Sequence, residues 1–204
     1  EIGRAARQIR TQGERCKAIT HKLLSFARKT DPSVRSVDLN ELAEEVIGLV
    51  GQKARYANVR VEHRHTPGLP AVCASPSELQ QVFLNLVNNA VDAIGPEGGT
   101  VTISTDAGDG EVLLRVADTG EGIPGANLAR IFDPFFTTKP VGQGTGLGLS
   151  ICYGIVDKLG GRITVDSEVG VGTTFTVVLP AGDCGPFEGE TGSARRTRGR
   201  GVQP

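Results

Sequence analysis

The 204-residue sequence contains no methionine and begins at Glu1, a combination that we expect of a fragment of a longer protein. A formal net charge of −1 gives no general field that would attract nucleic acid or an anionic membrane. No apolar run approaches the roughly 18–20 residues of a membrane span, and no signal peptide opens the chain. The cysteines Cys16, Cys73, Cys152 and Cys184 lack C-x-x-C spacing, which favours reduced cytosolic thiols over disulfides or zinc ligands. We therefore expect a cytoplasmic segment without nucleic-acid or membrane contacts, although the full-length protein could be membrane-anchored.

Hydrophobic periodicity predicts an α+β fold, a two-layer sandwich preceded by one long helix. Residues 2–29 follow a heptad seam, so this helix should pack against a partner helix or a second copy of the chain. Further helices are predicted from Asp38 and after Ser75-Pro76, where residues typical of helix N-termini occur. Alternating apolar residues predict strands at 58–65, 71–74, 100–105, 111–118, 162–166 and 173–179, and Gly108-Asp109-Gly110 predicts a hairpin turn between two of them.

These elements divide the chain into three parts. Residues 1–32 form the predicted long helix, and residues 36–182 form the α+β domain. Glycine, proline and charged residues dominate from residue 181 onward, so residues 183–204 are predicted to be a disordered tail. The arginine cluster at 195–200 is interpreted as a solvated terminus rather than a nucleic-acid contact.

Glycines at every second position mark the segment between Lys139 and Ser150. They are Gly142, Gly144, Gly146 and Gly148. The segment leads into an apolar helical pattern, and a glycine-rich loop that opens a helix is suited to bind phosphate. The spacing fits neither G-x-G-x-x-G nor the P-loop, which argues against those two nucleotide motifs. A flexible linker is the simpler alternative.

The helix predicted over 78–94 has an apolar side and a broader polar side. Three asparagines lie on the polar side, although asparagine is a mediocre helix former. Asn85 and Asn89 are one turn apart and offer carboxamide oxygens suited to Mg²⁺ that bridges phosphates. Simple solvation of this side is the alternative.

Asp118 directly follows a predicted strand and begins the segment D-T-G-E-G-I-P. A carboxylate at a strand end can receive the amino group of a base, while nearby glycines let the backbone approach the ring. A turn rich in Asp and Gly is the simpler interpretation of this segment alone.

Four segments together resemble the N, G1, F and G2 boxes of sensor histidine kinases. They are N-L-V-N-N-A (85–90), D-T-G-E-G-I (118–123), F-D-P-F-F-T-T-K (132–139) and G-Q-G-T-G-L-G-L (142–149). Their order and spacing match the family's ATP-binding catalytic domain, which shares a superfamily with gyrase, MutL and the heat-shock chaperone ATPase. The resemblance covers residues 36 to 180. It implies a Bergerat-type fold, with about three helices on a mixed sheet and a mobile lid between Asp133 and Thr145.

The resemblance implies ATP and Mg²⁺ as ligands, with Asn85, Asn89 and Lys139 as the catalytic residues. Asn89 would be the metal ligand, and Asn85 would lie near the phosphates. Asp118 would accept a hydrogen bond from the adenine amino group, helped by Thr174 on the last strand. The base pocket would be shaped by Gly120, Gly122 and Ile123. The phosphates would be held by Thr138, Lys139, Gly142, Gly144, Thr145, Gly146, Leu147 and Gly148.

Two positions refine this comparison. Hydrolases of the superfamily carry a water-activating glutamate at the position of Asn85, and a carboxamide cannot remove a proton. Asn85 therefore favours phosphate transfer to another nucleophile over hydrolysis. Many family members carry Lys or Arg at the position of Asp92, so that here Lys139 would have to hold the phosphates alone.

The implied function is the catalytic portion of a two-component sensor histidine kinase. It would transfer the ATP γ-phosphate to a histidine, for relay to an aspartate of a response-regulator receiver domain. None of His21, His63 and His65 fits the family's acceptor motif, so the acceptor is expected upstream of Glu1. The N-terminal helix is similar to the second helix of the family's dimerisation and phosphotransfer hairpin, which implies a homodimer. The alternatives are a superfamily ATPase of the gyrase or MutL type and a non-catalytic nucleotide-sensing scaffold.

Overall fold

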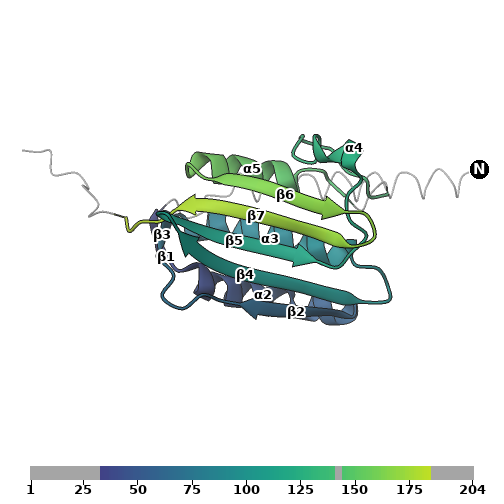
Figure 1. The fold of residues 1–204 in the computed structure, drawn as a ribbon, viewed down its shortest axis with the longest axis horizontal. Helices are drawn as coiled ribbons and strands as arrows, with labels where there is room; N and C mark the ends of the chain where they lie inside the picture. Colours follow the sequence, from purple (N-terminus) through teal and green to yellow (C-terminus); the bar gives the residue numbers. More distant parts are fainter. Residues whose placement is uncertain (1–32, 141–143, 185–204) are drawn as a thin grey trace, which may run out of the picture.

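The computed structural model describes residues 33–140 and 144–184 of the chain (Figure 1). Three expectations concern residues outside these ranges: the helix over 1–32, the tail beyond residue 184 and the role of Gly142. Within the described ranges, no helix combines the length and the apolar composition that crossing a membrane requires.

Five strands form one layer of the domain, in the order β2-β4-β5-β7-β6 (Figure 1). They are β2 (Val59–Arg64), β4 (Gly99–Gly108), β5 (Glu111–Asp118), β6 (Arg162–Glu168) and β7 (Gly172–Pro180). Strand β2 runs parallel to β4, whereas the other neighbouring pairs are antiparallel. The mixed sheet that the sequence predicts is confirmed.

Three helices cover one face of this sheet (Figure 1). They are α2 (Leu39–Tyr56), α3 (Pro76–Ala93) and α5 (Gly148–Lys158). Helix α3 lies between the other two and contacts both. Because successive strand side chains point to opposite faces, alternate residues such as Leu114 and Val116 are buried beneath the helices. The predicted two-layer α+β architecture is thus confirmed.

Two local signals act as the sequence predicts. The backbone of Asp38 is extended, and its carboxylate accepts a hydrogen bond of 2.7 Å from the Asn40 N–H, which caps α2. Between β4 and β5, Asp109 and Gly110 have φ values of 55° and 77°, as a two-residue hairpin turn requires. The predicted helix start and hairpin are confirmed.

A second, smaller sheet joins β1 (Arg35–Val37) to β3 (Val72–Ala74) in antiparallel pairing. The sequence predicts β3, where Val72, Cys73 and Ala74 are all apolar, but not β1, where Val37 is the only apolar residue. The single-turn helix α4 (Gly125–Leu128) is also missed, because four residues are too few to show a helical period.

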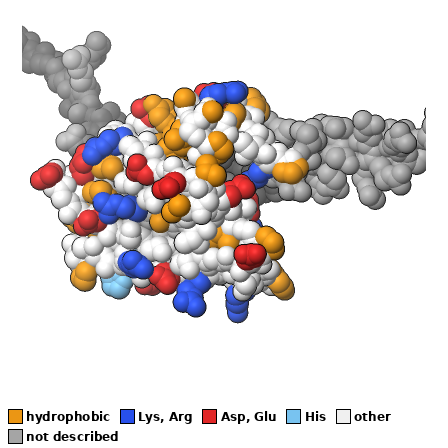
Figure 2. Space-filling model, turned by 45° about the vertical axis from the view of Figure 1, so that its right-hand side comes forward, with side chains coloured by type: hydrophobic (Ala, Val, Ile, Leu, Met, Phe, Trp, Pro, Cys, Tyr) orange, Lys and Arg blue, Asp and Glu red, His pale blue; other side chains and the backbone are white. Residues whose placement is uncertain are grey.

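The surface of the described residues mixes both signs of charge. On the face drawn in Figure 2, basic and acidic side chains are interspersed over the sheet. Opposite charges are also paired among the described residues, as in Arg162 and Glu111, whose two hydrogen bonds measure 2.5 and 2.8 Å. This distribution agrees with the net charge of the sequence, and the absence of nucleic-acid contacts stays a prediction.

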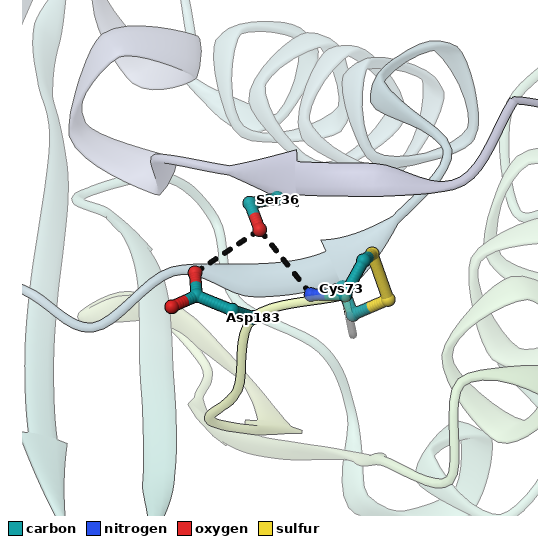
Figure 3. The surroundings of a disulfide bond; sticks show 4 residues. Ser36, Cys73 and Asp183 are labelled. Carbon is teal, nitrogen blue, oxygen red and sulfur yellow. Dashed lines mark hydrogen bonds between the residues drawn. A yellow bond between two sulfur atoms is a disulfide. The ribbon is translucent and has the colours of Figure 1, made fainter. Parts of the chain in front are cut away.

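The expectation of reduced thiols is wrong for Cys73 and Cys184, which form a disulfide (Figure 3). The two cysteines are 111 positions apart, so only the folded chain brings them together. The Ser36 hydroxyl donates to Asp183 at 3.0 Å and accepts from the Cys184 N–H at 3.3 Å. Burial raises the pKa of the remaining described cysteine, Cys152, to about 12, so this thiol stays protonated.

The chain beyond β7 is therefore bonded to the domain for four more residues. The Ala181 N–H donates to the Gly110 carbonyl at 2.8 Å, and the Gly182 N–H donates to the Ala71 carbonyl at 2.9 Å. With the contacts of Asp183, these bonds attach the described residues beyond 182 to the domain, and the boundary at 182 stays a prediction.

Reduction of the Cys73–Cys184 bond should lower the free energy of unfolding by about 4–5 kcal/mol, because closing a loop of this length restricts the unfolded chain. Urea denaturation with and without dithiothreitol measures the effect. The double variant Cys73→Ser/Cys184→Ser should match the reduced wild type and not respond to the reductant. If the wild type unfolds at the same urea concentration with and without dithiothreitol, the Cys73–Cys184 disulfide is not present.

Candidate functional site

Helix α3 carries the predicted metal and phosphate residues on its polar side. Its apolar side is buried on the sheet and consists of Leu79, Val82, Phe83, Leu86, Val87, Ala90 and Val91. Asn85 and Asn89 are half-buried on the other side, one helical turn apart. The Asn85 carboxamide donates to the Gly148 carbonyl at 3.2 Å, which joins α3 to the start of α5. The structure thus brings Asn85 next to the end of the glycine-rich segment.

Asp118 ends β5 and points to the side of the sheet that the helices cover. Its carboxylate accepts a hydrogen bond of 2.8 Å from the Gly120 N–H and another from the Thr173 N–H. Burial raises the pKa of Asp118 above its ordinary value, although these two bonds act in the opposite direction. A carboxylate has about four acceptor positions, so Asp118 retains the capacity to receive a further donor.

The threonine beside Asp118 is Thr173, and the prediction of Thr174 is wrong. In the ladder between β5 and β7, Asp118 is opposite Thr173, and Ala117 is opposite Thr174. Thr173 is 4% exposed, and its hydroxyl lies 2.8 Å from that of Ser167. Because neighbours in a strand point to opposite faces, Thr174 is on the face away from Asp118. The two adjacent threonines gave no sequence signal that distinguishes these registers.

The loop after Asp118 packs closely against the end of α3 and the turn between β6 and β7. A Cβ at Gly120 would lie 2.5 Å from the carbonyl oxygen of Ala93, so no larger residue fits without displacement. Gly122 has φ of +72° and lies against the backbone of the β6–β7 turn. The Ile123 N–H donates to a serine hydroxyl of β6 at 2.8 Å. These contacts hold the three predicted base-pocket residues beside Asp118.

The F box and the glycine-rich segment contact each other through Phe135 and Gly146. The Phe135 N–H donates to the Gly146 carbonyl at 2.9 Å, and both residues have positive φ (68° and 66°). A Cβ at Gly146 would lie 2.5 Å from the Phe135 carbonyl oxygen, so this crossing requires glycine. Of the other predicted phosphate residues, Thr138 is exposed and the half-buried ones are Gly144, Thr145, Leu147 and Gly148.

Lys139 is not the only lysine at this end of α3. Its Nζ lies 2.6 Å from Asp92 Oδ2, and the Nζ of Lys53, from α2, lies 2.6 Å from Asp92 Oδ1. Burial opposes ionisation of Asp92, but hydrogen bonds from Lys139 and Lys53 leave the pKa of this carboxyl below its ordinary value. Lys53 lies outside the four sequence boxes, and its position gave no signal before the helices were packed.

The mixed sheet with its covering helices is the fold of solved histidine kinase catalytic domains. The chain belongs to the histidine kinase-, DNA gyrase B- and HSP90-like ATPase family, whose sequence profile matches residues 74–183.

Sensor histidine kinases are among its relatives. ZraS of Escherichia coli (strain K12) is 37% identical over 180 residues, which are 88% of this chain and 38% of ZraS. The nucleotide-free catalytic domain of the histidine kinase ThkA is 36% identical with a TM-score of 0.66, covering 73% of this chain and 96% of that structure. ThkA has also been solved in complex with the response regulator protein TrrA (29% identity, TM-score 0.68, 85% of this chain, 49% of that chain).

A further solved relative contains a nucleotide analogue. Full-length ShkA in complex with AMPPNP is 31% identical with a TM-score of 0.73, covering 87% of this chain and 38% of ShkA. The chain therefore contains the catalytic ATP-binding domain of a two-component sensor histidine kinase. The chain spans 38% of the length of ZraS, so it corresponds to only part of that relative.

The donors of the site fit ATP and Mg²⁺. Asp118 offers a half-buried acceptor to a base, and Asn89 offers a carboxamide oxygen to a hard cation. Across residues 33–140 and 144–184, no group of three or more His, Cys, Asp and Glu side chains could hold a metal by itself. A carboxamide oxygen is a ligand type that suits Mg²⁺, which takes few protein oxygens and keeps water and phosphate ligands.

Replacing Asp118 by Asn should weaken ATP binding by roughly tenfold or more, because an acceptor is exchanged for a group that also presents N–H donors. The domain should remain folded. Calorimetric titration with ATP measures the affinity, and unchanged affinity would exclude Asp118 from base recognition.

The same variant tests the burial of this carboxyl. Since its folded-state pKa is raised, the stability that Asp118 contributes is present below its unfolded pKa and is lost as pH rises through its folded pKa. Thermal midpoints should therefore favour Asp118→Asn over the wild type more at about pH 7 than at about pH 4. A pH-independent difference would contradict a raised pKa.

Proposed function

We propose that the domain transfers the γ-phosphate of ATP to a histidine side chain, for relay to an aspartate of a response-regulator receiver domain. The observation that carries this proposal is Asn85, which occupies the place where a hydrolase needs a base. Its carboxamide donates to Gly148 and lies one turn before Asn89. A carboxamide cannot take a proton from water, so transfer requires a nucleophile that is activated elsewhere.

Other carboxylates near Asn89 do not supply that base. Asp92 lies nearly one turn further along α3, but both of its oxygens accept hydrogen bonds from lysines. Its lowered pKa makes it a poor proton acceptor at neutral pH. The polar side of α3 is therefore suited to hold a metal and phosphates and unsuited to activate water.

Phosphoryl transfer requires mainly positioning and neutralisation of charge. When bound, ATP supplies the phosphoryl group and Mg²⁺ neutralises part of its charge. Asp118 would fix the base, Asn89 would provide the protein ligand for the metal, and Lys139 would add a positive charge. The N–H groups around Gly146 would contact the phosphates, because the loop opens α5.

The phosphate acceptor is proposed to lie outside the described residues. His63 is in β2, the edge strand on the opposite side of the sheet from β6. Its pKa is lowered, mainly by burial and secondly by the nearby His65. His21 lies in residues 1–32, for which we retain the prediction of a dimerisation helix. The ThkA–TrrA complex supports a receiver domain as the partner.

Asn89→Ala should remove the gain in ATP affinity that Mg²⁺ provides, by roughly tenfold or more, while binding without Mg²⁺ changes little. Calorimetric titration of ATP in the presence of Mg²⁺ and in the presence of EDTA measures the affinity with and without the metal. Gln81→Ala, on the same helix and one turn before Asn85, is the matched control and should bind as the wild type. If Asn89→Ala keeps the full Mg²⁺ effect, the metal assignment is wrong.

The reaction itself is tested with the full-length protein and γ-labelled ATP. We expect acid-labile, base-stable label on the protein and little steady-state release of phosphate, since no base activates water. Steady-state hydrolysis without labelling would instead support an ATPase of the gyrase or MutL type. Absence of ATP binding would support a non-catalytic scaffold.

A further inference from the structure

Three elements meet at Asp92 and place two ammonium groups on one carboxylate. Lys53 of α2 lies 2.6 Å from Oδ1, and Lys139, which ends the F box, lies 2.6 Å from Oδ2. Lys53 also donates to the Asn88 side-chain oxygen at 2.9 Å. Each lysine thus has a defined position relative to the polar side of α3, where Asn89 lies.

The charges in this cluster do not cancel. Two ammonium groups and one carboxylate carry a net charge of +1, on the side of α3 that faces the predicted phosphate site. A single Asp92 carboxylate there would repel the phosphates of a nucleotide, whereas the cluster attracts them. The side chains of Lys53 and Lys139 are 46% and 34% exposed, so both can reach a ligand.

The donors of the two lysines are also only partly used. An ammonium group has three N–H donors. Among the described residues, Lys53 donates to Asp92 and Asn88, and Lys139 Nζ donates to Asp92. One donor of Lys53 and two of Lys139 are left for a ligand, while Asp92 restricts the positions of both side chains.

We infer that Lys53 is a phosphate-binding residue of the nucleotide site, held in place by Asp92 together with Lys139. The inference rests on the proposed function, because it assumes that ATP phosphates lie along the polar side of α3. It also accounts for Asp92 at a position where the histidine kinase resemblance expects Lys or Arg. In this chain, the cation at that place comes from α2 instead of α3, and the carboxylate positions it.

A second interpretation is that Lys53 and Asp92 only connect α2 to α3. Partly exposed ion pairs contribute little to stability, and the chain contains a matched example of such a connection. Lys158 of α5 contacts Glu78 of α3 at 2.8 and 3.1 Å, far along the helix from Asp92. Comparing Lys53 with Lys158 therefore separates a role in binding from a role in helix packing.

The test is calorimetric titration of ATP and of adenosine into the wild type and the variants Lys53→Ala and Lys158→Ala. Lys53→Ala should weaken ATP binding roughly tenfold, as expected for loss of a charge-assisted contact, and leave adenosine binding unchanged. Lys158→Ala should leave both affinities unchanged. The double variant Lys53→Ala/Asp92→Lys should recover most of the ATP affinity, because it returns the cation to α3.

Unchanged or tighter ATP binding by Lys53→Ala would overturn the inference, with the lysine reduced to a surface ion pair. An equal loss of ATP and adenosine binding would also overturn it, since that result indicates damage to the whole site. If the wild type binds ATP and Lys53→Ala binds ATP with the same affinity, the role of Lys53 is wrong but the proposed function is unaffected. If the wild type binds no ATP, the proposed function fails as well.

Discussion

Burial of the apolar side of α3 on the sheet is the constraint on which the domain and its site both depend. The helix packs between α2 and α5, so its rotation is fixed by seven buried side chains that include Phe83 and Leu86. A shift of one residue would turn the helix by about 100° and bury carboxamides in place of aliphatic groups. The same packing that stabilises the core therefore directs Asn85 and Asn89 outward and brings Gly148 of α5 within hydrogen-bonding distance of Asn85.

The site contains features that oppose stability and that a domain without a ligand would not need. The Asp118 carboxyl is half-buried, which raises its pKa, and Phe135 adopts a positive φ that is unfavourable for a side chain of this size. Both are held by neighbouring backbone groups, Asp118 by two N–H donors and Phe135 by the carbonyl of Gly146. Such costs concentrate where geometry serves binding, and they occur here at the proposed base acceptor and at the crossing between the F box and the glycine-rich segment.

Much of this could be predicted from sequence because it depends on local signals. The cap at Asp38 and the Asp109-Gly110 turn each need only a few neighbouring residues. Each of the four boxes is likewise a short contiguous segment. What could not be predicted depends on packing: the Cys73–Cys184 bond joins residues 111 positions apart, and Lys53 reaches Asp92 only because α2 lies beside α3. The error at Thr174 combines both cases. The strand itself was predicted, but its register with β5 was not, and that register decides which threonine faces Asp118.

A carboxamide at Asn85, the position where a hydrolase of this superfamily needs a base, has a consequence for control. Water reacts slowly with a phosphoryl group that is positioned but not attacked by an activated nucleophile, so a domain of this kind can hold ATP without consuming it. In the proposed reaction, the rate of transfer would then depend on how often an external histidine reaches the polar side of α3, and not on the chemistry inside the domain. A protein that regulates its own phosphorylation through movement needs this separation, because a base within the site would convert every bound ATP into phosphate whether or not a signal had arrived.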